Sequence, residues 1–348
     1  MEIIHGGDIY NNDIQLDFSV NGNPLGAPEA VRKALEEALE KIGSYPDIRA
    51  ERLRKAVGEM LEIPEEFLLF GNGASELFLA GVHGIRPGRT VIPVPSFYGY
   101  EYAAKAGGGE ILYYPMREEL GFVPGEDLRA VLTEEVDLLF LANPNNPTGR
   151  TLDREYLLEV LAHCRQRGIR VMLDECFAPF CMENVSMIGA VERFENLILT
   201  GAFTKTFGIP GVRLGYLACV GEQVRAKIKR QLPEWNLSCF AQEAGIACGG
   251  QKEFLKRTVS YTAEERKFLT KGLEELGITV ISGEADFLFL HSRENLYEKL
   301  LEKGILIRDC RNFRGLQEGY YRIAVKSREE NEILLRAIGE IKCRKQRA

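Results

Sequence analysis

The chain has 348 residues, which is enough to bury a sizeable core and exceeds the size at which single cores usually stop growing. Its formal net charge of −7 argues against a broad nucleic-acid-binding surface. No apolar run approaches the roughly 20 residues of a membrane helix, and the N-terminal segment lacks the basic and apolar regions of a secretory signal. We therefore expect one large and one smaller globular domain, with neither nucleic acid nor membrane as a partner.

The first two thirds of the chain read as an α/β pattern. A helical pattern at residues 27–43 follows an irregular N-terminal arm, and short, continuously apolar runs then alternate with helical patterns. The runs predict strands at residues 67–70, 90–94, 110–114, 137–142, 169–174, 197–200 and 213–219. Runs without polar alternation are typical of strands covered on both faces, so this pattern predicts a mostly parallel sheet with helices on both sides.

The last third has an α+β pattern. A long helical region from about residue 238 to residue 276 precedes four short apolar runs with helices between and after them. These runs predict strands at residues 278–282, 285–291, 305–310 and 320–326. We expect the N-terminal arm and helix (1–40) to join the small domain (238–348), and the large domain to span residues 41–237.

The cysteines and histidines point to no metal site. The eight cysteines are scattered and form no Cys-x-x-Cys pair, which predicts reduced thiols and a cytoplasmic protein. The four histidines, at positions 5, 83, 163 and 291, are far apart in the sequence and match no metal motif.

Polar segments follow five of the expected strands. They are GNGASE (71–76), PSFYGY (95–100), NPNNPTG (143–149), Asp174 and GAFTK (201–205). In open α/β sheets ligands bind beyond the carboxyl ends of the strands. We therefore expect these segments to meet at one rim of the sheet and to form a site.

Two of these segments have both a structural and a functional interpretation. In GNGASE, two glycines before a helix start would leave the N–H groups of Ala74 and Ser75 free to bind a phosphate, but a plain turn capped by Ser75 would have the same sequence. Glu76 stands where a dinucleotide fingerprint needs its third glycine. NPNNPTG is a rigid turn of favoured turn residues, and it could also hold the amide of Asn146 in place.

Charged residues in buried positions favour a functional interpretation. A carboxylate at a buried strand end, such as Asp174, needs a partner such as a protonated nitrogen. In AFTKTFGIPGVRLGY (202–216), Arg213 would suit a bidentate anion, and a desolvated Lys205 beside another cation becomes a nucleophilic amine. Lys205 could instead extend its ammonium group to solvent. Together the residues favour a site for a phosphorylated carbonyl cofactor bound as a Schiff base.

Taken in order, the motifs GNGASE, PSFYGY, NPNNPTG, LDECF and AFTKTFGIPGVRLGY resemble those of the fold-type I pyridoxal-phosphate enzymes. More narrowly, they are similar to the histidinol-phosphate aminotransferase branch of the class I/II aminotransferases. The resemblance extends from DFSVNGNPLG (17–26) to YYRIAVKSREEN (320–331). It implies the aspartate aminotransferase-like fold, with a mostly parallel central sheet, helices on both faces and a smaller α+β domain. It also implies pyridoxal 5'-phosphate as the cofactor.

The resemblance implies roles for the matching residues. Lys205 would hold the aldehyde of the cofactor, Asp174 would keep the ring nitrogen protonated, and Asn146 would hydrogen-bond the ring 3-oxygen. Phe97 would stack on the ring. The phosphate would be bound by the Ala74 and Ser75 amides, Thr204 and Arg213. Tyr45 would reach the phosphate in the neighbouring subunit, which implies a homodimer.

Two residues depart from the family pattern. Phe177, beside the ring, stands where a tyrosine is common, so one donor to the 3-oxygen is absent. Ala202 replaces a serine or threonine that often precedes the lysine by three residues, so one phosphate contact is lost.

Three segments are more similar to the L-threonine-O-3-phosphate decarboxylases of cobalamin synthesis than to transaminases. They are HGG (5–7), DFSVNGNPLG (17–26) and LIRDCRNFRGL (306–316). By this resemblance His5, Arg308 and Arg322 would bind the phosphate and carboxylate of the substrate, with Asn23 as a further ligand. We expect decarboxylation of O-phospho-L-threonine to (R)-1-amino-2-propanol phosphate.

Two alternatives stay open. One is an aminotransferase that acts on histidinol phosphate or another amino acid with 2-oxoglutarate. The other is a non-catalytic cofactor-sensing module of the kind that transcription regulators carry beside a DNA-binding domain, for which residues 1–40 are too few to supply the second domain.

Overall fold

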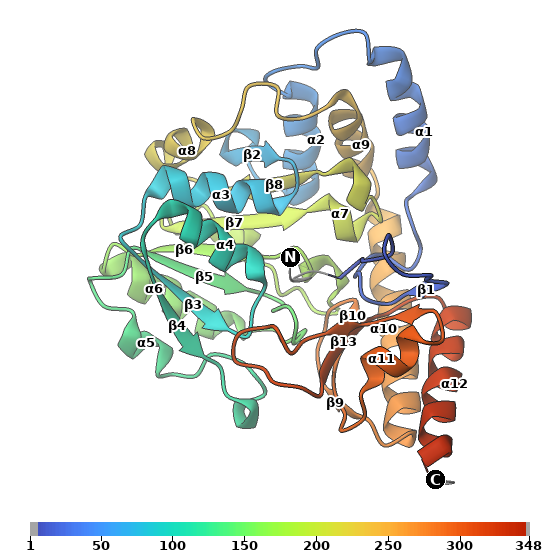
Figure 1. Ribbon diagram of the computed structural model, residues 1–348. Helices are drawn as coiled ribbons and strands as arrows, with labels where there is room; N and C mark the ends of the chain where they lie inside the picture. Colours follow the sequence, from blue (N-terminus) through green and yellow to red (C-terminus); the bar gives the residue numbers. More distant parts are fainter. Residues whose placement is uncertain (1–5, 346–348) are drawn as a thin grey trace.

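The computed structural model describes residues 6–345. Figure 1 shows a central sheet with helices on both of its faces and a smaller sheet beside the C-terminal helix. The central sheet has seven strands and the smaller sheet four. This arrangement confirms the predicted fold class.

The seven expected strands of the large sheet are all present. In sheet order they are β2 (Leu68–Gly71), β8 (Gly215–Ala218), β7 (Leu197–Ala202), β6 (Arg170–Asp174), β5 (Leu138–Ala142), β3 (Arg89–Val94) and β4 (Glu110–Pro115). All neighbours from β7 to β4 pair in parallel, whereas β8 is antiparallel to both β2 and β7. Every residue of β2, β5, β7 and β8 is buried, which explains their continuously apolar sequences.

The register of the sheet brings its polar strand ends to one rim. Asp174, the last residue of β6, pairs with Ala142 on one side and with Thr200 on the other. Because β8 runs in the opposite direction, its first residue, Gly215, pairs with Ala202 near the end of β7. Arg213 therefore reaches the same rim as the carboxyl ends of the parallel strands.

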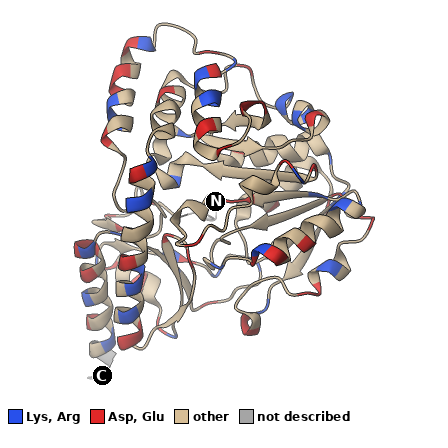
Figure 2. Cartoon of the chain, turned by 180° about the vertical axis from the view of Figure 1, so that it is seen from behind, with Lys and Arg blue, Asp and Glu red and all other residues tan. Residues whose placement is uncertain are grey.

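Helices flank this sheet on both faces (Figure 1). They are α2 (Glu51–Leu61), α3 (Ala74–Ile85), α4 (Tyr98–Gly107), α5 (Leu128–Val131), α6 (Arg154–Gln166), α7 (Phe203–Thr206) and α8 (Glu222–Lys229). In α6, the Asp153 side chain accepts hydrogen bonds from the first-turn amides, and apolar residues at helical spacing from Leu157 to Cys164 are buried. Figure 2 shows the charged residues mainly along the helices, while the strands are mostly uncharged.

The smaller sheet is antiparallel, in the order β12 (Arg308–Asp309), β13 (Tyr320–Ala324), β10 (Phe287–His291) and β9 (Thr279–Ile281). Helices α10 (Lys252–Glu275), α11 (Leu296–Leu301) and α12 (Arg328–Lys345) complete this part, and leucine and isoleucine side chains from the sheet and helices form its core. The expected strand at 305–310 is two strands. β11 (Ile305–Leu306) pairs in parallel with β1 (Leu16–Asp17) of the arm, whereas β12 pairs with β13.

The long helical region at 238–276 is two helices, because α9 (Cys239–Gly249) ends at Gly250 before α10 begins. Helix α9 packs against α2 and against α1 (Glu29–Glu37), near the large sheet (Figure 1). The arm strand β1 instead joins the smaller part. The division into residues 1–40, 41–237 and 238–348 therefore stays a proposal. Within residues 6–345, none of the helices combines the length and the apolar character needed to cross a bilayer.

Candidate active site

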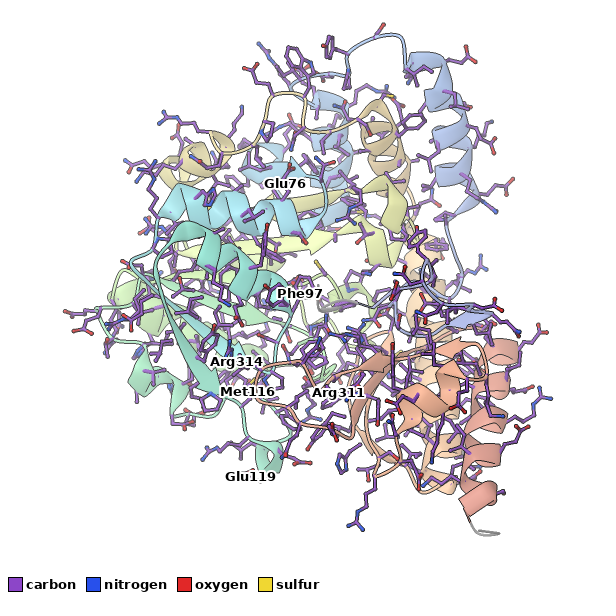
Figure 3. The ribbon with its side chains drawn as sticks, in the orientation of Figure 1. Glu76, Phe97, Met116, Glu119, Arg311 and Arg314 are labelled. Atoms are coloured by element: carbon purple, nitrogen blue, oxygen red, sulfur yellow. The ribbon has the colours of Figure 1, made fainter. Side chains whose placement is uncertain are left out.

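A cavity of about 770 Å³ lies at the rim where the strands of the large sheet end. Its walls come from this rim, from the arm and from the segment between β12 and β13. Most of the predicted site residues line it, namely Ala74, Ser75, Phe97, Asn146, Asp174, Phe177, Thr204, Lys205, Arg213, Arg308 and Arg322. In Figure 3, Phe97, Arg311 and Arg314 lie in the region between the two sheets.

Asp174 is buried at the end of β6 and is held by two donors. The hydroxyl of Tyr100 donates to Oδ2 at 2.6 Å, and the amide of Cys176 donates to Oδ1 at 2.9 Å. Burial raises the pKa of the Asp174 carboxyl above its usual value, and these hydrogen bonds oppose the rise because they favour the charged form. A fixed carboxylate of this kind suits a protonated ring nitrogen.

Lys205 follows β7 in the short helix α7, and its side chain is mostly buried. Its Nζ donates to the carbonyl oxygen of Asn21 at 3.1 Å. Burial lowers the pKa of the Lys205 amine, and the neighbouring cations Arg322 and Arg213 act in the same direction. A lysine amine of lowered pKa in a cavity is the type of group that forms a Schiff base with an aldehyde.

The start of α3 and Arg213 form a cationic end of the cavity. The residue that caps α3 is Gly73, which has no side chain to accept hydrogen bonds from the first-turn N–H groups of the helix. Gly73 precedes the helix with φ +77°, and a Cβ there would lie 2.5 Å from Nη2 of Arg213. Only glycine therefore allows the guanidinium to approach this turn. The combination of free amides and a guanidinium suits a phosphate group.

Asn146 is joined to Arg322 of the smaller sheet. Nη1 of Arg322 donates to Oδ1 of Asn146 at 2.6 Å, and Nη2 donates to the carbonyl oxygen of Ser19 at 2.7 Å. Arg322 is 7% exposed, and burial lowers its pKa to about 10. The Phe177 ring meets the Phe287 ring edge-on at 5.0 Å, and the guanidinium of Arg322 lies 5.4 Å from the centroid of the same Phe287 ring.

The segment between β12 and β13 supplies further arginines. Arg308 is 7% exposed and donates to the Asp309 carbonyl at 2.6 Å and to Oδ1 of Asn312 at 2.7 Å. Arg314 forms an ion pair with Glu101 of α4 at 3.0 Å and lies 4.0 Å from the centroid of the Tyr113 ring. The segment between β12 and β13 therefore places arginine side chains beside both the smaller sheet and the large one.

The residues fit pyridoxal phosphate. The cavity offers a phosphate-binding end, an amine for the aldehyde, a carboxylate for the ring nitrogen and an aromatic side chain, Phe97, for the ring face. Residues 13–338 match the family Aminotransferase class I and II. The chain belongs to this family. The cofactor of this family is pyridoxal phosphate.

Relatives of this aminotransferase-family protein include two kinds of enzyme. The chain is 34% identical to the threonine-phosphate decarboxylase of Salmonella typhimurium, over 97% of this chain and 96% of the relative. It is 31% identical to the histidinol-phosphate aminotransferase of Caldanaerobacter subterraneus, over 96% of this chain and 95% of the relative.

Solved structures show the same two kinds. The histidinol-phosphate aminotransferase from Clostridium acetobutylicum superposes with a TM-score of 0.89 at 31% identity, covering 94% of this chain and 99% of that one. The L-threonine-O-3-phosphate decarboxylase from Porphyromonas gingivalis has a TM-score of 0.82 at 27% identity, with the same coverages.

Two predicted site residues of this family member lie outside the cavity. Asn23 does not line the cavity; its amide donates to the Thr206 carbonyl at 2.6 Å and to Oγ1 of Thr258 at 2.7 Å, beneath α7. Tyr45 is 82% exposed and packs against Trp235 at 4.9 Å between ring centroids, outside the cavity. His5 lies outside the described residues.

The sequence analysis missed several residues that the fold brings to the site. Tyr100 contacts Asp174, and the Asn21 and Ser19 carbonyls contact Lys205 and Arg322. Tyr100 lies three residues after Phe97, one helical turn along α4, so its spacing was a usable signal. The contacts from the arm are made by backbone carbonyl oxygens, and no residue type or spacing in the sequence indicates such contacts.

Proposed function

We propose that the protein decarboxylates an O-phosphorylated amino acid, O-phospho-L-threonine, to (R)-1-amino-2-propanol phosphate. The observation that carries the proposal is a pair of arginines, Arg308 and Arg322, each 7% exposed, in the same cavity as Lys205 and Asp174. A substrate with both a phosphate and a carboxylate offers one anion to each guanidinium. The 34% identity to a threonine-phosphate decarboxylase supports this choice.

The residues of the cavity act by position and charge. Bound pyridoxal phosphate withdraws electrons from the bonds at the substrate Cα. Lys205 would hold the aldehyde of the cofactor, and its free amine would carry a proton beside the substrate Cα. Asp174 would keep the ring nitrogen charged. Arg308 and Arg322 would hold the two anionic groups of the substrate and so orient the bond to its carboxylate for cleavage.

A substrate assay tests the proposal. With added cofactor, the protein should release CO2 and aminopropanol phosphate from O-phospho-L-threonine without forming an oxo acid. L-threonine should react with a kcat/KM about 100-fold lower, because a buried guanidinium is left without its anion. Oxo-acid formation that depends on 2-oxoglutarate, with no CO2, would instead identify an aminotransferase. That outcome is the second candidate, which the TM-score of 0.89 to a histidinol-phosphate aminotransferase favours.

We also propose a homodimer in which Tyr45 serves the site of the neighbouring subunit. The rings of Tyr45 and Trp235 pack together and are exposed, and three further exposed apolar residues, Leu39, Ile42 and Ile48, lie close to Tyr45 in the sequence. Clustered exposed apolar side chains are typical of a protein interface. Since Tyr45 does not line the cavity of its own subunit, a second copy is needed to bring it to a cofactor phosphate.

Mixed subunits test the role of Tyr45. Tyr45→Ala and Lys205→Ala proteins should each be nearly inactive. A dimer with one subunit of each kind has one site with both residues intact only if Tyr45 acts across the interface. Unfolding and refolding an equal mixture should then restore about a quarter of the wild-type activity per subunit. No restoration, despite mixed dimers in a mass measurement, would place Tyr45 in its own subunit's site or in none.

A further inference from the structure

The segment between β12 and β13 (310–319) joins two neighbouring strands of the smaller sheet, yet it extends to the large sheet. Six consecutive residues of this segment, 311–316, line the cavity. In Figure 1 the segment extends from β13 toward the strands of the large sheet. At Gly315 a Cβ would lie 3.8 Å from main-chain atoms of Val94 and Pro95, where β3 ends. The segment therefore forms a wall of the cavity that spans the two sheets.

Arg314 attaches this segment to the large sheet. Its Nη2 and Nε donate to the two carboxylate oxygens of Glu101 on α4, at 3.0 Å and 3.3 Å. Its guanidinium lies 4.0 Å from the centroid of the Tyr113 ring on β4. The Glu101 side chain is 12% exposed, and Lys105 of the same helix pairs with Oε1 of this carboxylate at 2.6 Å. A bidentate pair of this kind fixes the orientation of a guanidinium as well as its position.

The two residues that precede Arg314 in the segment contact Arg308. Oδ1 of Asn312 accepts a hydrogen bond from Nη2 of Arg308 at 2.7 Å. The Phe313 ring has its centroid 5.0 Å from the guanidinium carbon of Arg308. Because Asn312 and Phe313 are joined to Arg314 by one or two peptide bonds, the contacts that fix Arg314 also limit where these two side chains can lie. The position of the Arg308 guanidinium therefore depends on the attachment of the segment.

We propose that Arg314 and Glu101 are positioning residues that form a latch between the segment 310–319 and α4, and that this latch fixes Arg308 for an anionic group of the substrate. The role of Arg308 as an anion ligand comes from the proposed function, so the inference rests on it. A guanidinium that is already held in place loses less conformational entropy when the substrate binds. Without the latch, substrate binding should weaken, whereas Lys205 and Asp174 keep their own contacts.

Hydrogen exchange tests the latch without any substrate. In the protein with added pyridoxal phosphate, the amides of residues 310–319 should exchange about five- to tenfold faster in Glu101→Ala and in Arg314→Ala than in wild type. The double variant should exchange no faster than Arg314→Ala alone, because the same pair is already broken. Mass spectrometry of the peptides from this segment gives the rates.

Steady-state kinetics tests the link to Arg308. In Arg314→Ala the KM for O-phospho-L-threonine should rise about tenfold while kcat stays within about twofold of wild type. Arg314→Lys keeps the charge but cannot bind both carboxylate oxygens at once, so it should give an intermediate KM. The double variant with Glu101→Ala should again be no worse than Arg314→Ala.

The matched control breaks an arginine–glutamate pair that lies outside the cavity. Glu159 of α6 pairs with Arg129 of α5 at 2.7 Å, and neither residue lines the cavity. Glu159→Ala should therefore leave both the exchange of residues 310–319 and the KM unchanged.

Three results would decide the matter. Wild-type exchange in a folded Glu101→Ala protein would overturn the latch, and this variant also covers the case in which Arg314→Ala does not fold. Faster exchange with an unchanged KM, or single-variant effects on KM that multiply in the double variant, would overturn the link to Arg308. Transamination by the wild-type protein, with a KM for its amino acid that still rises in Arg314→Ala, would contradict the proposed function and keep the latch.

Discussion

Lys205→Ala is expected to lower turnover by about 10⁴-fold or more, because the variant loses both the amine that holds the cofactor and the group that carries the proton. Reduction of the wild-type protein with borohydride in the presence of pyridoxal phosphate should fix the cofactor to the Lys205 peptide. The variant should show no such adduct in mass spectrometry. A circular dichroism spectrum and melting temperature close to those of the wild type would show that the variant has lost the covalent link and not the fold.

The matched control is Lys256→Ala. Lys256 lies on α10 with its side chain 74% exposed and pairs with the exposed Glu253, so this change should leave both activity and adduct intact. An adduct at another lysine in the Lys205→Ala protein, together with retained turnover, would show that the nucleophile has been misassigned.

Asp174→Asn is expected to lower kcat by about 10²–10³-fold while the protein still binds the cofactor. The amide has the shape of the carboxylate, but it cannot stabilise a charged ring nitrogen, so the variant loses charge and little packing. A cofactor analogue methylated at the ring nitrogen has a permanent charge and should restore part of the activity. Equal activity of Asp174→Asn and wild type would contradict the role of Asp174.

Tyr100→Phe should affect the same carboxylate, Asp174, but less strongly than Asp174→Asn. The Tyr100 hydroxyl stabilises the charged form of Asp174, so its removal should raise the pKa of that carboxyl further. The acid side of the pH–kcat profile should then move to higher pH, with a loss of about tenfold at the lower end of the range. A uniform loss at every pH would indicate a packing effect instead.

Much of the fold could be predicted because its strands are local apolar runs. The run that ends at Asp174 is buried on both faces, and a polar residue at the end of such a run stands out in the sequence. Lys205 and Arg213 were recognisable for the same reason, as charges in an apolar and glycine-rich stretch. The family motifs then assigned a role to each of these residues.

The pairings between distant segments could not be predicted. The reversal of β8 depends on which strands pair, and the Tyr100–Asp174 contact joins residues 74 positions apart. The contact of Arg322 with Asn146 joins the two sheets across 176 positions.

The N-terminal arm limits which insertions and deletions this enzyme can tolerate. The carbonyl of Asn21 accepts from Lys205 and the carbonyl of Ser19 accepts from Arg322, so two main-chain atoms only two residues apart contact both cations. The backbone of the arm therefore sets the distance between Lys205 and Arg322. Because both contacts use main-chain atoms, one inserted or deleted residue between positions 19 and 21 should change this spacing.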